Sequence, residues 1–146
     1  MRKFEAVPGK EEKYTSPKRS TVGSAGYDLV SPETVHIGPR GGTATIKTGV
    51  RAIIPEDEVL LVYNRSSLPV KHGLSLVNAV GVIDSDYYNN PDTLGEIMVT
   101  FRNEGFKVAT INEGDRIAQC IFTKFYKTDD DNAVGVRTGG YGSTGK

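Results

Sequence analysis

In the segment Ile97-Met98-Val99-Thr100-Phe101, the apolar residues 97, 99 and 101 alternate with Met98 and Thr100. This pattern decides the fold class. Alternation with a period of two residues is typical of a strand that buries one face. Other short segments of strand character lie between glycines and prolines, at Thr43–Arg51, Val59–Asn64, Leu74–Ala79, Glu96–Arg102 and Arg116–Lys124. No window keeps apolar residues at helical spacing for three turns. The sequence therefore predicts an all-β protein: an antiparallel sandwich, a jelly roll or a small barrel.

The chain divides into a β-rich body and a polar C-terminal part. We expect one domain over residues 1–127, an acidic linker over 128–133, and a tail over 134–146 that is rich in Gly, Ser and Thr. The tail has few apolar side chains to bury, so we expect it to be mobile without a ligand. At most one short helix is expected, near residues 66–70, where a polar residue could cap it before Pro69 disturbs it.

Charge and composition exclude several classes of function. The 146 residues carry 18 Lys and Arg against 18 Asp and Glu, so the formal net charge is zero. This balance argues against a protein whose main work is binding nucleic acid or an anionic membrane. The longest apolar run, Val59 to Tyr63, is far shorter than the roughly 20 residues of a membrane span.

The cysteine and histidine content narrows the chemistry further. Cys120 is the single cysteine, and the N-terminal residues have no apolar stretch, so we expect a cytoplasmic protein without a disulfide. His36 and His72 lie far apart in the sequence, and with one cysteine they cannot form a zinc site. A carboxylate is therefore the expected catalytic base.

Two segments have residues suited to phosphate or to a metal ion. In Ser24–Leu29 (SAGYDL), small residues lead into Asp28, which could be held at the start of a strand and face a hydrated Mg²⁺ ion. The alternative is a tight turn that feeds a strand, and on this segment alone it is favoured. In Asn64–Pro69 (NRSSLP), Arg65 and two hydroxyl residues offer the donors that phosphate oxygens need. The alternative for this second segment is a helix N-cap beside a solvated arginine.

The segment Asn78–Tyr87 (NAVGVIDSDY) brings two carboxylates close together in the sequence. If the segment is a strand, Asp84 and Asp86 project from the same face. One of two like charges near a phosphate site could be tuned to take a proton from water. The alternative, and the more common situation, is a strand end bordered by solvated aspartates.

The tail segment Arg137–Lys146 (RTGGYGSTGK) combines an arginine, an aromatic residue and several glycines. Residues 140–146 match most of a phosphate-binding P-loop, but the Ser or Thr and the helix that should follow are absent from this sequence. Two interpretations stay open: a loose tail, or a glycine-rich flap that becomes ordered on an anion. The positions of Arg137 and Tyr141 favour the flap.

These four segments and a fifth, taken in order, resemble the motifs of the trimeric dUTP diphosphatase (dUTPase) family. The resemblance extends from about Ser16 to Gly145. The motifs stand here as Ala25–Leu29 (AGYDL), Arg65–Leu68 (RSSL), Gly81–Tyr87 (GVIDSDY), Gly114–Gln119 (GDRIAQ) and Gly139–Gly145 (GGYGSTG). A chance match of five motifs in this order is not credible.

The resemblance implies a jelly-roll-like distorted barrel of the β-clip type that assembles into a threefold homotrimer. In the family, three active sites lie at subunit interfaces, and the C-terminal tail closes over them. The implied reaction is hydrolysis of dUTP to dUMP and pyrophosphate, with Mg²⁺ on the triphosphate. This reaction keeps uracil out of DNA and supplies dUMP for thymidylate synthesis.

The resemblance also implies a role for each matching residue. Asp84 would orient and deprotonate the attacking water, and Asp28 would hold the Mg²⁺ ion through its water shell. Phosphate oxygens would be bound by Arg65, Ser66, the Ser67 backbone and Gln119, and the terminal phosphates by Arg137, Gly142, Ser143 and Thr144. Uracil and the sugar would be recognised by Asn78, by the backbone of Val82, Ile83 and Met98, by Tyr87 against the deoxyribose, and by Tyr141 over the base.

Three positions depart from the family pattern. Ser67 stands where glycine is usual, which is tolerable for a residue that contributes mainly its N–H. Residues Tyr88–Leu94 (YNNPDTL) stand where a single residue is usual. We expect this inserted loop to extend away from the catalytic base with little effect on catalysis, and it is where a protein partner would be sought. Arg137 lies four residues before Tyr141, one closer than usual.

Two other functions compete with this interpretation. A dCTP deaminase shares the Arg-Ser-Ser-Leu segment, but alignment of residues 97–103 puts Thr100 where that enzyme needs a glutamate, and threonine is no general base near neutral pH. A non-catalytic nucleotide sensor or protein-binding regulator is the second alternative. The presence of Asp84 together with every phosphate-binding motif argues against an inactive enzyme.

Overall fold

The computed structural model describes residues 1–142, and these residues form a mostly β structure with one short α-helix. The strands are β1 Lys3–Ala6, β2 Tyr27–Val30, β3 Val35–Ile37, β4 Thr43–Lys47, β5 Val50–Ile53, β6 Glu58–Asn64, β7 Leu74–Leu76, β8 Val80–Ile83, β9 Met98–Asn103, β10 Ala109–Ile111 and β11 Arg116–Lys124. The helix α1 spans Ser67–His72, and short 3₁₀ turns span Glu11–Lys13 and Ser85–Tyr87. The predicted all-β class and the single short helix are confirmed.

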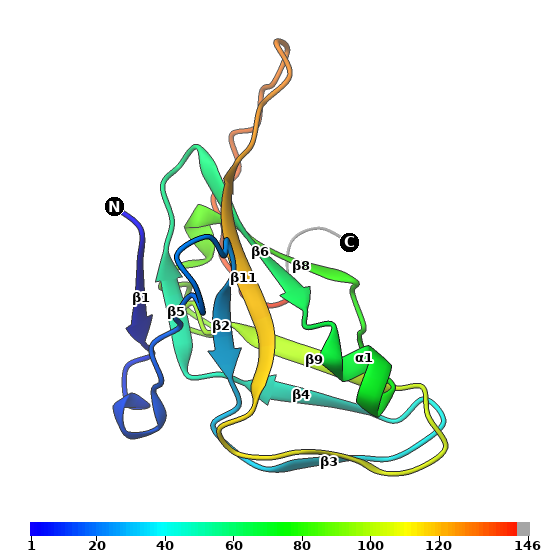
Figure 1. Ribbon diagram of the computed structural model, residues 1–146. Helices are drawn as coiled ribbons and strands as arrows, with labels where there is room; N and C mark the ends of the chain where they lie inside the picture. The colour runs from blue at the N-terminus through cyan, green and yellow to red at the C-terminus, as the bar shows by residue number, and fades with distance from the viewer. Residues whose placement is uncertain (143–146) are drawn as a thin grey trace.

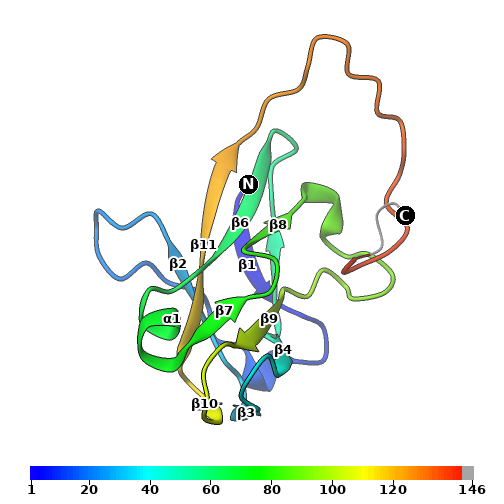
Figure 2. The same ribbon diagram turned by 90° about the vertical axis from the view of Figure 1, so that its right-hand side faces the viewer.

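The strands form four antiparallel sheets that pack around one core (Figure 1). The largest sheet has the order β2-β11-β6-β8, and a second sheet has the order β4-β9-β7. The pairs β1-β5 and β10-β3 complete the arrangement. The described strands do not close into one continuous barrel. After β11 the chain runs away from the sheet and returns, so that its described end lies beside the segment that follows β8 (Figure 2).

The side chains of β9 are buried in the alternating pattern that the sequence predicted. Val99, Phe101 and Asn103 are buried, whereas Met98 and Thr100 are only partly buried on the other face. Phe101 lies in a core of fully buried aliphatic side chains. These include Leu29, Ile37, Ile46, Leu60, Leu74, Ile97, Ile111 and Ile117. The core thus draws on both larger sheets, and the partly buried Ile83 of β8 packs against it.

The segment Thr43–Arg51, predicted as one strand, is divided into β4 and β5. The division falls at Thr48 and Gly49, and Gly49 has φ +72°, a left-handed conformation that glycine adopts without steric cost. The buried Thr48 hydroxyl donates to the Ile97 carbonyl at 2.7 Å and accepts the Val50 N–H at 3.2 Å. Alternation continues across this corner, so periodicity alone could not reveal it.

A buried carboxylate fastens this corner to the segment before β9. Glu96 is 5% exposed, and its carboxylate accepts the Gly49 N–H at 3.0 Å and the Lys10 ammonium at 2.7 and 2.8 Å. The backbone carbonyl of the same residue accepts the Tyr87 hydroxyl at 2.7 Å. Glu96 therefore ties the N-terminal segment, the β4–β5 corner and the turn after β8 together.

Replacing Glu96 by alanine should destabilise the fold. We expect Glu96→Ala to lower the free energy of unfolding by about 2–3 kcal/mol, because the buried Gly49 N–H loses its acceptor and Lys10 loses its counter-ion. Urea denaturation at fixed protein concentration measures the change. Glu12→Ala, which removes an exposed carboxylate, is the matched control and should stay within about 0.5 kcal/mol of the original. Equal stability of the two variants would contradict the role of Glu96.

Candidate active site

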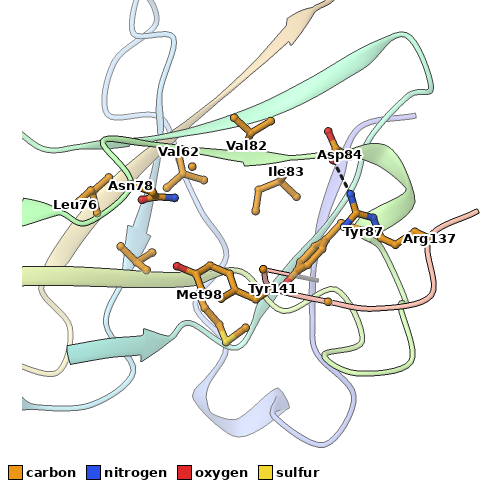
Figure 3. Close-up of a pocket in the computed structure, with 14 residues that line it drawn as sticks. Val62, Leu76, Asn78, Val82, Ile83, Asp84, Tyr87, Met98, Arg137 and Tyr141 are labelled. Atoms are coloured by element: carbon orange, nitrogen blue, oxygen red, sulfur yellow. Dashed lines mark hydrogen bonds and ion pairs between the residues drawn. The ribbon is translucent and has the colours of Figure 1, made fainter. Parts of the chain in front are cut away.

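A pocket of about 360 Å³ lies where β8 faces β9 (Figure 3). That volume is in the range of small-ligand sites. It is lined by Val62, Leu76, Asn78, Gly81, Val82, Ile83, Asp84, Tyr87, Met98, Val99, Arg137, Gly140, Tyr141 and Gly142. Nine of the residues implied by the family resemblance, from Asn78 to Gly142, are therefore brought together here.

The edge position of β8 gives the pocket its hydrogen-bonding character. β8 ends the four-stranded sheet and pairs only with β6 within it, in the register Leu61↔Val82. An edge strand presents N–H and C=O groups on its open side. The Val82 side chain is 62% exposed and points away from Met98 and Tyr141 in Figure 3. A ligand in the pocket can therefore form hydrogen bonds with main-chain N–H and C=O groups of β8.

The two aspartates of the third motif converge, although not in the way predicted. The strand ends at Ile83, and residues 85–87 form a 3₁₀ turn, so the prediction that Asp84 and Asp86 lie on one strand face was wrong. Both carboxylates instead meet the guanidinium of Arg137, Asp84 at 2.6 Å and Asp86 at 2.7 Å. The arginine side chain is only 10% exposed, whereas both carboxylates are more than half exposed.

Tyr87 forms a rigid wall of the pocket. Its ring is 6% exposed, and its hydroxyl is held by the Glu96 carbonyl. The Arg137 guanidinium carbon lies 5.9 Å from the ring centroid. Burial raises the pKa of the Tyr87 phenol above its usual value, so the group stays neutral and remains a donor. The ring therefore has a fixed place beside Asp84.

The C-terminal segment covers this pocket and contacts the inserted loop, residues 88–94. The Tyr141 hydroxyl lies 3.3 Å from the Thr100 hydroxyl on β9. The Gly140 N–H donates to the Asp92 carboxylate at 2.9 Å. The inserted loop itself does not line the pocket that contains Asp84, as expected, but it holds the segment whose Arg137 contacts Asp84. That the loop has little effect on catalysis stays a prediction.

A second cluster of predicted residues lies around Asp28. Its carboxylate is 3.4 Å from Arg65 and 3.5 Å from Arg116, and it accepts the Ser20 hydroxyl at 3.0 Å. Nearby, Gln119 pairs with Asp28 across β11 and β2. The turn alternative for Ser24–Leu29 is partly right, because β2 begins at Tyr27 and carries Asp28.

The second motif lies at the start of α1. Ser66 precedes the helix and Ser67 is its first residue, and the Ser66 hydroxyl makes no capping hydrogen bond. The alternative of a simple N-cap is therefore not supported. Arg65 is not merely solvated either, since it is paired with Asp28.

The two clusters lie at opposite ends of β6 within one chain. Ile83 pairs with Leu60, and Arg65 follows Leu60 by five residues along an extended strand, a separation of roughly 17 Å. Asp28, Arg65, Ser66, Ser67 and Gln119 do not line the pocket that contains Asp84. Ser143 and Thr144 lie outside the described residues.

The surroundings of Asp28 suit only a metal ion that is also held by water and by substrate phosphates. Among residues 1–142, no cluster of three or more His, Cys, Asp or Glu side chains could hold a metal. Mg²⁺ characteristically keeps waters and needs one or two carboxylates together with substrate phosphates. The donors around Asp28 therefore suit an ion that arrives on a phosphate chain, and they do not form a resident cage.

Two contributors to these clusters were not singled out from the sequence as site residues. Arg116, inside the fourth motif, pairs with Asp28, and its basic side chain within that motif was the available signal. Asp92 contacts Gly140, but it stands in the inserted loop, where the family pattern offers no guide. No helix in the described range 1–142 is long and apolar enough to cross a membrane.

The fold and site define a β-class protein with a ligand-sized pocket beside an acidic turn. The dUTPase family model matches residues 12–145. The chain is 46% identical over 148 residues to deoxyuridine 5'-triphosphate nucleotidohydrolase of Lactococcus lactis, covering 99% of this chain and 98% of the relative. It is 40% identical over 137 residues to the enzyme of the same name from Desulfitobacterium hafniense, covering 88% and 86%.

A crystal structure of dUTPase from Streptococcus mutans superposes with a TM-score of 0.78 at 40% sequence identity, covering 87% of this chain and 98% of that one. The chain belongs to the dUTPase family. The jelly-roll-like class expected from the motifs is confirmed with it.

The hydrogen bond from the Tyr87 hydroxyl to the Glu96 carbonyl stabilises the pocket wall in a pH-dependent way. We expect Tyr87→Phe to lower the free energy of unfolding by about 1 kcal/mol at neutral pH, because the Glu96 carbonyl loses its donor. The folded-state pKa is raised by burial above the unfolded value of about 10. The contribution is therefore fully present below about pH 10 and is lost as the pH rises through the folded-state pKa.

Urea denaturation at pH 8 and above pH 10, at fixed protein concentration, measures this effect. The stability difference between the original chain and Tyr87→Phe should narrow at the higher pH. Tyr126→Phe, at a tyrosine that is 90% exposed, should show no difference at either pH. A stability difference between the original chain and Tyr87→Phe that does not change with pH would show that the buried hydroxyl does not make this stabilising hydrogen bond.

Proposed function

We propose that this chain hydrolyses dUTP to dUMP and pyrophosphate, with Asp84 as the base. The observation that carries the proposal is the placement of Asp84 at the end of edge strand β8, where the pocket meets Arg137. Membership of the dUTPase family and the shared name of its relatives support the same reaction.

Uracil is recognised by the amide of Asn78 and by the backbone of Val82, Ile83 and Met98. The ring presents both donors and acceptors, and an amide with strand N–H and C=O groups can match them. A hydrogen-bonding pocket rejects a ring with the wrong edge strongly, because its own buried groups would be left unpaired. Tyr141 stacks over the base, and Tyr87 packs on the deoxyribose and leaves no room for a 2′-hydroxyl.

The phosphates are bound by groups from both clusters, and the working unit is a homotrimer with sites at its interfaces. Arg137 and Gly142, with Ser143 and Thr144, grip the terminal phosphates. Arg65, Ser66, the Ser67 N–H and Gln119 come from a neighbouring copy of the chain. The separation of Arg65 from Asp84 along β6 supports this, since one chain does not bring them together.

Asp28 would hold Mg²⁺ through its water shell when the ion is carried by the triphosphate. The ion supplies charge neutralisation on the phosphate oxygens. The ion pairs that Asp28 makes with Arg65 and Arg116 keep its carboxylate oriented until the nucleotide is bound. The chain's own part around Asp28 is therefore to orient the phosphates.

In the chemical step, Asp84 takes a proton from a water molecule. The water oxygen bonds to phosphorus as the bridging bond between the first and second phosphates breaks, and pyrophosphate leaves. Arg137 binds Asp84 and Asp86. Transfer of this arginine to the phosphates frees the Asp84 carboxylate to accept the proton.

The cellular role follows from the reaction. Removing dUTP keeps uracil out of DNA, and dUMP serves thymidylate synthesis, in the cytoplasm. Nucleic acid and membrane binding are not part of this proposal. A deaminase is disfavoured, because Thr100 binds the hydroxyls of Thr45 and Tyr141 and provides no carboxylate at that position.

Pyrophosphate release from dUTP, dCTP, UTP and dTTP, with and without Mg²⁺, tests the function. We expect dUTP with Mg²⁺ to be strongly preferred and no ammonia to be released from dCTP. Asp84→Asn should retain nucleotide binding but lower turnover by roughly 10²–10⁴-fold, since the amide cannot accept the proton. Asp57→Asn, at an exposed aspartate of the β5–β6 turn, is the control. Near-normal turnover of Asp84→Asn would rule out this base.

Subunit mixing tests whether the site is shared. Asp84→Asn and Arg65→Ala should each be inactive as pure proteins. Coexpressed in equal amounts, they should recover roughly one quarter of the sites, because a mixed trimer joins an intact Asp84 from one chain to an intact Arg65 from its neighbour. Absence of any recovery in trimers shown to be mixed would place the whole site within one chain.

A further inference from the structure

The inserted loop, residues 88–94, has a definite internal structure. Asn90 is 4% exposed and lies at its centre. Its amide nitrogen donates to the Tyr87 carbonyl and to the Thr93 hydroxyl, both at 2.7 Å. Its amide oxygen accepts the N–H groups of Asp92 at 3.1 Å and Thr93 at 2.9 Å. One side chain therefore fixes the backbone that carries Asp92.

The loop is also fastened to the β1–β5 sheet. The Tyr88 hydroxyl donates to the Glu5 carboxylate at 2.8 Å. The Arg51 guanidinium carbon lies 4.6 Å from the Tyr88 ring centroid, and the same arginine donates to the Asn89 side chain at 3.3 Å. These contacts come from β1 and β5 and not from the C-terminal segment. The inserted loop is thus a braced platform and not a free hairpin tip.

The C-terminal segment sits on this platform at Gly140. The residue is buried, and its N–H donates to Asp92 at 2.9 Å. A Cβ at this position would lie 2.6 Å from the Thr93 methyl and 3.0 Å from the Asn90 oxygen. Only glycine lets the backbone approach so closely. The contact lies between Arg137, which binds the two aspartates, and Tyr141, which covers the pocket.

We propose that Asp92 is a positioning residue for the C-terminal segment, and that the inserted loop is the seat on which this segment closes. The proposal rests on the proposed function, because closure matters there for holding the phosphates. A segment rich in glycine loses much conformational entropy on ordering, and an ionised acceptor for a backbone N–H offsets part of that loss. Asp92 acts through the backbone and does not itself touch the substrate.

A tryptophan reporter can follow closure directly, because the chain contains no tryptophan. Tyr141→Trp places a single fluorophore on the segment and keeps an aromatic ring at that position. In this background, the variants are Asp92→Ala, Asp92→Asn, which keeps a carbonyl oxygen, and Asp130→Ala, which removes an exposed aspartate of the linker. Fluorescence is titrated with a non-hydrolysable dUTP analogue, and kinetics on dUTP are measured with Tyr141 intact.

We expect Asp92→Ala to raise the analogue concentration for half-maximal fluorescence change, and to lower kcat/KM, by roughly tenfold. Asp92→Asn should recover most of this loss, and Asp130→Ala should match the original. Melting temperatures and trimer content should be equal in all variants, because the seat is not part of the core. A merely structural role for Asp92 would change the melting temperature and leave the fluorescence midpoint in place.

Gly140→Ala provides an independent test from the other side of the contact. It should show the same defect as Asp92→Ala, and the double variant should be no worse than either single one, because both remove the same contact. If Asp92→Ala behaves like Asp130→Ala while the original chain hydrolyses dUTP, the seat is refuted and the function stands. If the original chain does not hydrolyse dUTP, the proposed function fails, whatever the fluorescence shows.

Discussion

The buried Glu96 is the point on which the geometry of the site depends. Its carboxylate binds the Gly49 N–H and Lys10, and its carbonyl binds the Tyr87 hydroxyl. A buried carboxylate is costly unless it is paired and hydrogen-bonded, so Gly49 and Lys10 cannot move away from it without a large free-energy cost. Because Tyr87 ends the turn that carries Asp84, the same constraint that closes the β4–β5 corner fixes one wall of the pocket.

Under the proposed function, the strand order accounts for a site that is open to a nucleotide and incomplete in one chain. β8 lies at one edge of the large sheet and β2 at the other, with β11 and β6 between them. The edge leaves the backbone of β8 available for a base, and the opposite edge carries Asp28. Groups that must meet on one triphosphate are thereby held apart by the width and length of a sheet. A symmetric oligomer resolves this, because a neighbouring copy can bring its β2 edge to this pocket.

Much of the fold was predictable because its signals are local. β11 spans the predicted Arg116–Lys124, and β9 buries the residues that its alternation selects. The β4–β5 corner and the turn after Ile83 were not predictable from period, because a change of direction need not interrupt alternation. The motif order gave the site residues as a set, but their division into two clusters depends on long-range pairing. The contact of Asp92 with Gly140 joins positions 48 residues apart in an atypical loop, where no local rule applies.

The arginines of both clusters are paired with carboxylates, as the zero net charge of the chain would suggest. Arg65 and Arg116 share Asp28, and Arg137 is held between Asp84 and Asp86. Each cation that would meet phosphate therefore already has a carboxylate partner, so nucleotide binding exchanges one anion for another. A triphosphate carries several negative charges and competes well for these arginines, whereas a monophosphate competes poorly. Under the proposed function, cleavage would divide the charge of the triphosphate between dUMP and pyrophosphate, and the carboxylates would recover the arginines as both products leave.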